Sequence, residues 1–254
     1  MSPSDHDVPA ALAEGGLARV ARAATRAWLA AALLLGLAGC ATGPDAHPRD
    51  PLEPFNRGVY RFNEAVDDAV LKPVAEGYQA AVPQPVRTGV ANFFGNLRDL
   101  WSAVNAALQA RPQPAAENFM RFSVNTVLGL GGVLDIASEM GLARTTLDFG
   151  HTLGRWGVPS GPYLVLPLLG PSTVRDTVAL LADRRGDPVA QGGEDVATRN
   201  ALQALRIVQQ RATLLRAGEL LDQAALDKYG FTRDAYLARR QRQIEEAQGR
   251  NGDE

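Results

Sequence analysis

The sequence predicts a mainly α-helical protein behind an amino-terminal targeting segment. Apolar residues recur at three- and four-residue steps through most of the chain, and alternating strand patterns are scarce. The 25 glycines and 16 prolines among 254 residues divide this pattern into separate helices joined by Gly/Pro-rich connections. The length suits one sizeable domain, and two domains are possible but not required.

Residues 1–39 are typical of a bacterial signal peptide. Three arginines precede an uncharged apolar run at 27–39, which is too short to remain as a membrane-spanning helix. The run closes on Leu-Ala-Gly before Cys40, which resembles a bacterial lipobox. The alternative is a chance small-residue cleavage site with an unmodified cysteine. We expect Cys40 to become the first mature residue and to carry diacylglycerol and an N-acyl chain.

The residues after Cys40 predict a polar tether at 40–49, without apolar periodicity. Ala41 stands where an aspartate would favour retention at the inner membrane, so the outer membrane is the expected destination. From Phe55 onward the apolar steps predict an amphipathic helix that ends or kinks near Lys72-Pro73.

Prolines bound the next two predicted helices. One begins after the Pro-Gln-Pro at 83–85, continues to Leu108 and stops by Arg111-Pro112. The other covers 115–128 and runs into the glycine cluster at 129–132, which predicts a turn or a close approach to the backbone.

The stretch between Arg155 and Arg175 contains four prolines and no charge. Its length would suit a membrane span, but its prolines forbid a regular helix. It is either irregular extended structure in the core or a segment in contact with the membrane, and the residues alone favour the core.

Helical patterns resume in the last third of the chain. Ser172 is the expected N-cap of a helix at 174–183, and a long helix follows 192–194 and continues through Leu215. Thr232 is the expected cap of the last helix, which continues through Ile244. Residues 241–254 form a polar tail that we expect to be disordered at its end.

The residue types argue against several classes of function. Cys40 is the only cysteine, and His151 is the only histidine outside the leader and tether, so we expect neither a metal site nor a nucleophile with its base. We interpret His151 as structural. The net charge of −2 gives no support for nucleic-acid binding. We therefore expect no enzyme and no bound cofactor beyond the acyl chains.

Several motifs, in order along the chain, resemble the MlaA/VacJ family of lipoproteins. They are DPLEPFNR (50–57), YRFN (60–63), KPVA (72–75), VPQPVR (82–87), NFFGNL (92–97), RFSVNT (121–126), LGLGG (128–132), FGHTLGRWGV (149–158) and GPYLVLP (161–167). The matches cover most of an expected domain at 50–240, behind the lipobox. Any one motif could arise by accident, but several in register are specific.

The resemblance implies a single ring-like helical domain embedded in one leaflet of the outer membrane of a Gram-negative bacterium, lipid-anchored and facing the periplasm. The implied function is removal of misplaced phospholipids from the outer leaflet through an amphipathic channel, and their transfer to a periplasmic MlaC-like carrier. A porin trimer is the other implied partner. The alternative is a structural lipoprotein that tethers envelope components without passing lipid.

The resemblance and the glycine cluster together name two sets of candidate residues. The channel or gating candidates are Phe62, Asn63, Asn125, Leu128, Gly131 and Gly132. The resemblance also shifts the uncharged segment toward membrane contact, with Tyr163, Leu164, Val165, Leu166, Leu168 and Leu169 as candidates. Residues 184–191 depart from the family because they are short and polar, which puts a membrane-dipping element there in doubt.

Overall fold

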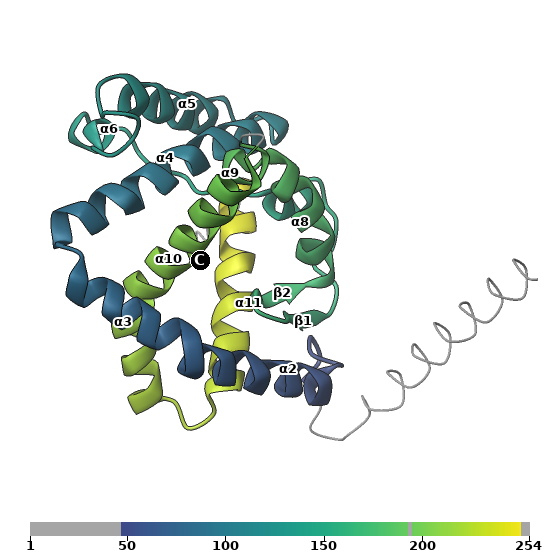
Figure 1. Cartoon of the computed structure of the whole chain (residues 1–254). Helices are drawn as coiled ribbons and strands as arrows, with labels where there is room; N and C mark the ends of the chain where they lie inside the picture. The colour runs from purple at the N-terminus through teal and green to yellow at the C-terminus, as the bar shows by residue number, and fades with distance from the viewer. Residues whose placement is uncertain (1–46, 193–194, 250–254) are drawn as a thin grey trace, which may run out of the picture. The chain divides into compact units, whose positions relative to one another are not determined.

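The computed structural model describes residues 47–192 and 195–249 (Figure 1). The chain divides into two units, Met1–Pro54 and Phe55–Glu254. Cys40 and the signal peptide lie outside the described residues. Of the first unit, residues 47–54 are described, and there the Asp50 amide donates a hydrogen bond to the His47 carbonyl at 2.9 Å.

Helices make up most of the second unit, which confirms the predicted class. In chain order the described elements are α2 (Glu53–Val66), the π-helical turn η1 (Asp67–Leu71), α3 (Lys72–Ala81), α4 (Gln84–Leu108), α5 (Pro112–Val127), α6 (Ile136–Glu139), α7 (Phe149–Arg155), β1 (Tyr163–Leu166), β2 (Gly170–Thr173), α8 (Val174–Gly186), α9 (Pro188–Gln191), α10 (Val196–Ala224) and α11 (Lys228–Ala247).

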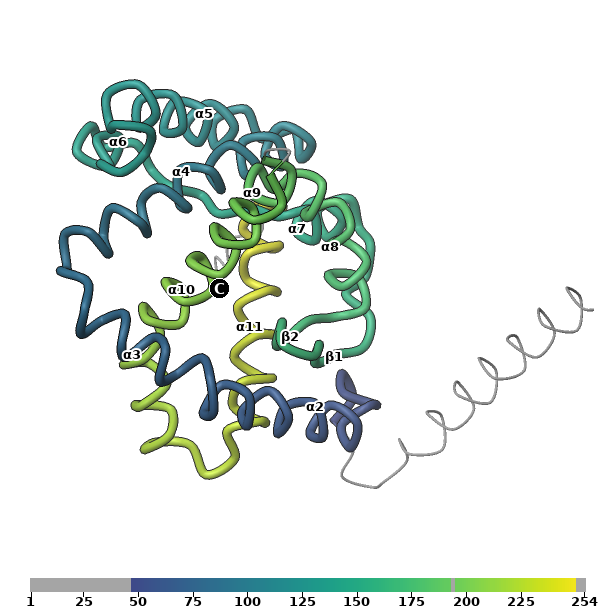
Figure 2. The backbone as a smooth tube through the Cα atoms, viewed as in Figure 1, coloured from purple at the N-terminus to yellow at the C-terminus, as the bar shows by residue number. Residues whose placement is uncertain are grey.

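Contacts between these elements close a circuit within the second unit. The continuous stretch α2–η1–α3 leads into α4, α4 contacts α7, α7 packs on α8, and α8 contacts the β-hairpin. Asn56 and Asn63 then join the hairpin back to α2. Helix α10 packs on α3 and α4, and α11 contacts α7 and β2. Figure 2 traces this ring-like path of the backbone.

A π-helical turn interrupts the first helical stretch near the predicted kink. Pro73 stands in the first turn of α3, where its missing N–H costs no helical hydrogen bond, so the helix resumes and continues to Ala81. Arg211 of α10 holds the preceding turn through two contacts of 2.7 Å to the carboxylate of Asp67. The predicted break near Lys72-Pro73 is therefore a π-helical turn, and the helical path does not end there.

The glycine cluster forms the turn between α5 and α6. Leu130, Gly131 and Gly132 have φ angles of 55°, 72° and 95°, in the left-handed region that favours glycine. A Cβ at position 132 would also lie 2.6 Å from Asn96 Nδ2 of α4. The cluster therefore ends the helix and permits a close approach, as the sequence predicted.

A buried ion-pair network fastens this turn to α4. Arg121 of α5 is 1 % exposed and donates to the Leu142 carbonyl at 2.6 Å. It also forms ion pairs with Asp135 at 2.8 Å and with Asp99 of α4 at 3.3 Å. Arg144 contacts the same Asp99 carboxylate at 3.0 Å. The two arginines thereby satisfy carboxylates that would be costly to bury alone.

The uncharged segment forms an antiparallel β-hairpin, in which Tyr163 pairs with Thr173 and Leu166 with Gly170. Two side-chain amides of α2 bind its backbone. Asn56 donates to the Tyr163 carbonyl at 3.1 Å and accepts from the Val165 amide at 2.9 Å. Asn63 donates to the Leu166 carbonyl at 3.0 Å and accepts from the Leu168 amide at 2.8 Å.

The hairpin corrects part of the predicted membrane contact. Tyr163 is 0 % and Val165 1 % exposed, and both pack with Tyr229 and Leu237 of α11 in a hydrophobic cluster. Their side chains alternate inward, as period-two strand geometry requires, so these two candidates do not reach the surface. The preference of the residues alone for the core was right at these positions.

Two helix boundaries also need correction. Thr173, and not Ser172, caps α8 by accepting from the Asp176 amide at 3.2 Å. Thr232 lies inside α11, which begins at Lys228 after Asp227. Helix α11 continues to Ala247, as the predicted path through Ile244 required, and it includes the first residues of the polar segment at 241–254.

A cluster around Arg240 docks α11 against α7 and α8. Its guanidinium binds Asp148 at 2.7 Å and Asp176 at 2.9 Å. Burial raises the pKa of Asp176, but the Arg240 contacts outweigh it and the pKa is lowered overall. Asp148 and His151 form a capping box at the start of α7, with the His151 amide 2.9 Å from the Asp148 carboxylate. His151 thus has a structural role.

Candidate functional site

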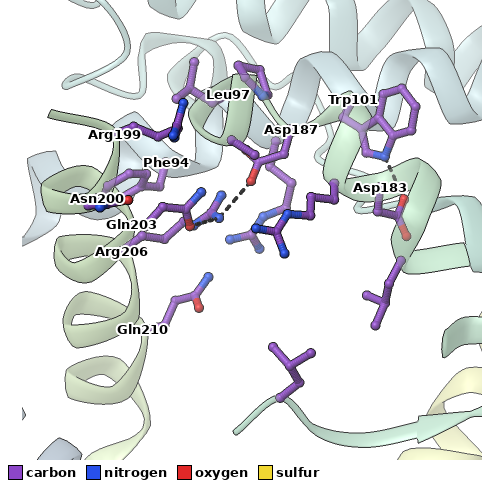
Figure 3. Close-up of a pocket in the computed structure, with 16 residues that line it drawn as sticks. Phe94, Leu97, Trp101, Asp183, Asp187, Arg199, Asn200, Gln203, Arg206 and Gln210 are labelled. Carbon is purple, nitrogen blue, oxygen red and sulfur yellow. Dashed lines mark hydrogen bonds and ion pairs between the residues drawn. The ribbon is translucent and has the colours of Figure 1, made fainter. Parts of the chain in front are cut away.

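A cavity of about 650 Å³ opens between α4, α8, α9 and α10, beside Leu169 of the hairpin turn (Figure 3). Its walls combine apolar and charged side chains from segments far apart in the sequence. Phe94, Leu97, Arg98, Trp101, Leu169, Leu180, Asp183, Arg184, Asp187, Pro188, Ala190, Arg199, Asn200, Gln203, Arg206 and Gln210 line it.

Helix α4 supplies most of the apolar wall. Phe94, Leu97, Arg98 and Trp101 occupy positions i, i+3, i+4 and i+7 and therefore share one face of the helix. Trp101 is fixed by a hydrogen bond of 2.8 Å from its indole nitrogen to the Asp183 carboxylate.

The end of α8 approaches this tryptophan closely because residue 186 is a glycine. A Cβ on Gly186 would lie 2.3 Å from Cε3 of the Trp101 ring. Any side chain there would move α8 or the indole. The short polar connection of residues 184–191, which departs from the family pattern, is therefore a wall of the cavity.

Helix α10 supplies the polar wall. Arg199, Asn200, Gln203, Arg206 and Gln210 recur on one face, and Figure 3 shows them along the same side of the helix. Arg206 forms an ion pair of 2.8 Å with Asp187 at the start of α9 and also donates to Gln203. This pair ties the α10 wall to the opposite side of the cavity.

Positive charge exceeds negative charge in the lining, which holds Arg98, Arg184, Arg199 and Arg206 against Asp183 and Asp187. Burial lowers the pKa of Arg98, and the nearby charges of Arg144 and Arg206 lower it further. Burial likewise raises the pKa of Asp183, although Trp101 and the Phe149 amide donate to it. The cavity is consequently an electropositive environment.

An apolar pocket of about 450 Å³ adjoins the same helix, one to three turns earlier along α4. It is lined by Pro85, Val86, Gly89, Val90, Phe93, Val133 and Leu205. Helix α10 contributes Leu205 to this pocket and the next residue, Arg206, to the cavity. An apolar space and a cationic space therefore lie along one helix.

The gating candidates fall into two groups, and neither lines the cavity. Asn125, Leu128, Gly131 and Gly132 come together at the α5–α6 turn, where Asn125 accepts from the Ala137 amide at 2.8 Å. Phe62 and Asn63 lie on α2, with Asn63 bound to the hairpin. A role in gating stays a prediction for both groups.

The remaining membrane-contact candidates differ in solvent exposure. Leu168 and Leu169, at the hairpin turn, are 65 % and 71 % exposed, while Leu164 and Leu166 are half-buried. Their contact with a membrane stays a prediction.

The sequence did not predict that the four arginines of the cavity lining, Arg98, Arg184, Arg199 and Arg206, would lie around one space. The only signal was that residues 184–191 are polar where family members were expected to be apolar. The α10 positions resemble an ordinary solvated helix face.

The described residues contain no group of three or more histidine, cysteine or acidic side chains placed to hold a metal ion. Among the helices of the same residues, none combines the length and apolar character needed to cross a bilayer.

The sequence profile of the MlaA lipoprotein family matches residues 48–243. Proteins named intermembrane phospholipid transport system lipoprotein MlaA are 40 % identical to this chain in Shigella flexneri and in Escherichia coli, over 82 % of this chain and 85 % of theirs. The protein of that name in Haemophilus influenzae is 37 % identical over 80 % of this chain and 83 % of its own length.

A solved structure also shares the fold. It comes from work on the "structural basis for maintenance of bacterial outer membrane lipid asymmetry" and superposes with a TM-score of 0.67 at 36 % sequence identity. The match covers 77 % of this chain and 98 % of the solved one.

Proposed function

Because this chain belongs to the MlaA lipoprotein family, we propose that it removes misplaced phospholipids from the outer leaflet of the outer membrane and passes them to a periplasmic carrier. The proposed action is physical transfer of the intact lipid, without cleavage of its bonds. Its result would be the maintenance of outer-membrane lipid asymmetry.

The main structural support for this proposal is the lining of the cavity between α4 and α10. A phospholipid headgroup holds a phosphate that is costly to move through hydrocarbon without partners. The cavity offers guanidinium groups, such as Arg98 and Arg199, and neutral amides from Asn200 and Gln203. These groups would replace water around the headgroup, with charge-assisted hydrogen bonds to the phosphate.

Apolar surface for the acyl chains lies next to these groups. Phe94 and Leu97 line the cavity itself, and the pocket around Val90 and Phe93 continues the same apolar face of α4. A chain placed there would leave water while the headgroup stays among the arginines, which favours binding by roughly 25 cal/mol per Å² of buried apolar area.

The distribution of polarity supports contact with lipid. Several of the largest fully buried side chains are polar, including Arg121 and Asn118, whereas many large apolar side chains are exposed. Exposed examples on α2, α5, the hairpin turn and α8 are Phe62, Phe119, Val127, Leu128, Leu168, Leu169, Val178 and Leu181. On a soluble protein, exposed apolar surface is typical of an interaction site. In contact with a membrane leaflet, the same side chains would be stabilised by the lipid acyl chains.

We further propose that acyl chains on Cys40 anchor the protein at the periplasmic side of the outer membrane. The lipobox pattern and Ala41 support this placement. The family resemblance supports an MlaC-like carrier and a porin trimer as partners.

Complementation tests the proposal in a strain that lacks its own MlaA lipoprotein. We expect the wild-type chain to lower surface phospholipid, measured by digestion of intact cells with an added phospholipase, and to restore resistance to detergent. The variant Gln203→Trp with Gln210→Trp narrows the cavity and should restore neither. The matched control places tryptophans at Arg216 and Glu219, which are exposed on α10 outside the cavity.

Full restoration by the narrowed variant would contradict lipid passage through this cavity. If Cys40→Ala then failed while the narrowed variant succeeded, the structural tethering function would explain the protein better.

A further inference from the structure

We infer that the cavity between α4 and α10 selects phospholipids with a net negative headgroup, such as phosphatidylglycerol, over zwitterionic phosphatidylethanolamine. This inference rests on the proposed function and adds the class of headgroup. The inference rests on the excess of arginine over aspartate side chains in the cavity lining.

The positive charges in the lining are mostly uncompensated within the cavity. Asp187 is paired with Arg206 at 2.8 Å. The side chains of Arg98, Arg184 and Arg199 form no hydrogen bond or ion pair with any residue that the structure describes. Three guanidinium groups are therefore available to an anion from the membrane.

The remaining carboxylate offers little to an ammonium group. Asp183 Oδ1 accepts two hydrogen bonds, each 2.8 Å long, from the Trp101 indole and the Phe149 amide. Both donors are neutral, so they hold the carboxylate in place at the cavity wall without cancelling the arginine charges. A single such group does not balance the three free guanidinium groups.

A phosphatidylethanolamine headgroup brings one negative and one positive charge into this field. Its phosphate is attracted by the arginines, but its ammonium group is repelled by them at close range. A phosphatidylglycerol headgroup brings the same phosphate and replaces the ammonium with hydroxyl groups. The amides of Asn200, Gln203 and Gln210 on α10 can hydrogen-bond to hydroxyls without any charge penalty.

Neighbouring arginines add to the positive field at Arg98. Its side chain lines the cavity, and the charges of Arg144 and Arg206 act on it. Because Arg98 and Arg184 are exposed to solvent, salt screens their charges. We therefore expect the preference to decrease as the ionic strength is raised.

The experiment uses the mature lipidated protein, incubated with vesicles that contain phosphatidylglycerol and phosphatidylethanolamine in equal amounts. The protein is re-isolated in mild detergent and its bound lipids are quantified by mass spectrometry. We expect phosphatidylglycerol to be enriched about tenfold, the ratio that about 1.4 kcal/mol of repulsion between the arginines and the ammonium group would produce.

Variants separate charge from shape. Arg98→Gln with Arg199→Gln should bring the ratio close to one, whereas Arg98→Lys with Arg199→Lys should keep most of the enrichment. The matched control Arg216→Gln with Arg239→Gln removes the same charge from exposed positions outside the cavity, and the ratio should not change. A change that merely disturbed the fold would lower the amount of bound lipid without a reason to alter the ratio.

Equal recovery of the two lipids by the wild-type protein would overturn the headgroup preference and leave the proposed function intact. Absence of any bound lipid would overturn both. Displacement of the bound lipid by excess inorganic phosphate would assign the arginines to a soluble phosphate and would also overturn the inference.

Discussion

Replacement of Asp135 by asparagine tests whether the buried network holds α5 and α6 on α4. The Asp135 carboxylate binds Arg121 at 2.8 Å and accepts from Asn125 at 3.0 Å and from the Ser138 hydroxyl at 2.7 Å. Burial raises the pKa of Asp135, but these contacts outweigh it and lower the pKa from 3.8 to about 2. At about 1.36 kcal/mol per pKa unit, the folded protein favours the ionised form by roughly 2–3 kcal/mol.

An asparagine at this position would keep the shape of the side chain but not the charge, so we expect Asp135→Asn to lower the free energy of unfolding at neutral pH by roughly 2–3 kcal/mol. A carboxyl with a lowered folded-state pKa stabilises the protein above its unfolded-state pKa and loses this effect as the pH falls. The difference between wild type and variant should therefore shrink between about pH 4 and pH 2.

This difference in the free energy of unfolding is measured by urea titration at a constant concentration of a mild detergent, with circular dichroism as the signal. The matched control is Glu139→Gln, an exposed acid on the same short helix, which should change the stability by less than about 0.5 kcal/mol. A variant as stable as wild type at neutral pH, or a difference that stays constant down to pH 2, would refute the reasoning.

Two further predictions concern the hairpin. Asn56→Ala removes two buried hydrogen bonds, one to the Tyr163 carbonyl and one from the Val165 amide, so we expect a loss of roughly 2–4 kcal/mol in the same urea assay; a loss below about 0.5 kcal/mol would show that the two bonds contribute little. Leu168→Glu with Leu169→Glu, in a chain made unlipidated by Cys40→Ala, should weaken co-sedimentation with phospholipid vesicles at least tenfold, because two exposed apolar side chains become charged. Unchanged co-sedimentation would remove the hairpin turn from the membrane-contact surface.

Local patterns were sufficient to predict most of the helices. The flanking prolines of α4 specify its ends. Its apolar stripe does not mark the buried face, because Val86, Val104 and Leu108 are exposed. Most of the side chains that α4 buries are polar or small, among them Asn96, Asp99 and Asn105. The glycine cluster after α5 predicted the turn, because glycine adopts a left-handed backbone conformation without a steric penalty.

The hairpin was missed because tertiary contacts determine it. Its four-residue strands are too short to show a clear alternation, and α2 supplies backbone partners through Asn56 and Asn63. Those asparagines lie seven positions apart, two helical turns, which sequence inspection reads as ordinary polar positions. The start of α11 was misplaced because Thr232 fits the N-cap preference, although Asp227 occupies the N-cap position at its start.

The cavity was beyond sequence reasoning for a similar reason. Arg98 and Arg199 are far apart in the chain, and only the crossing of α10 over α4 brings them to one space. An arginine among polar neighbours on a helix most often faces water. The distinction between such a surface and a cavity wall depends on packing that no local pattern records.

The asparagine contacts to β1 have a consequence for assembly. A two-stranded sheet leaves unpaired amides and carbonyls along its outer side, and such a side can recruit strands from other molecules. Asn56 and Asn63 occupy backbone groups of Tyr163, Val165, Leu166 and Leu168 with side-chain amides instead. Because these backbone groups already have side-chain partners, they are not available to pair with a strand of another molecule. The apolar hairpin can therefore remain at the protein surface without promoting aggregation through this edge.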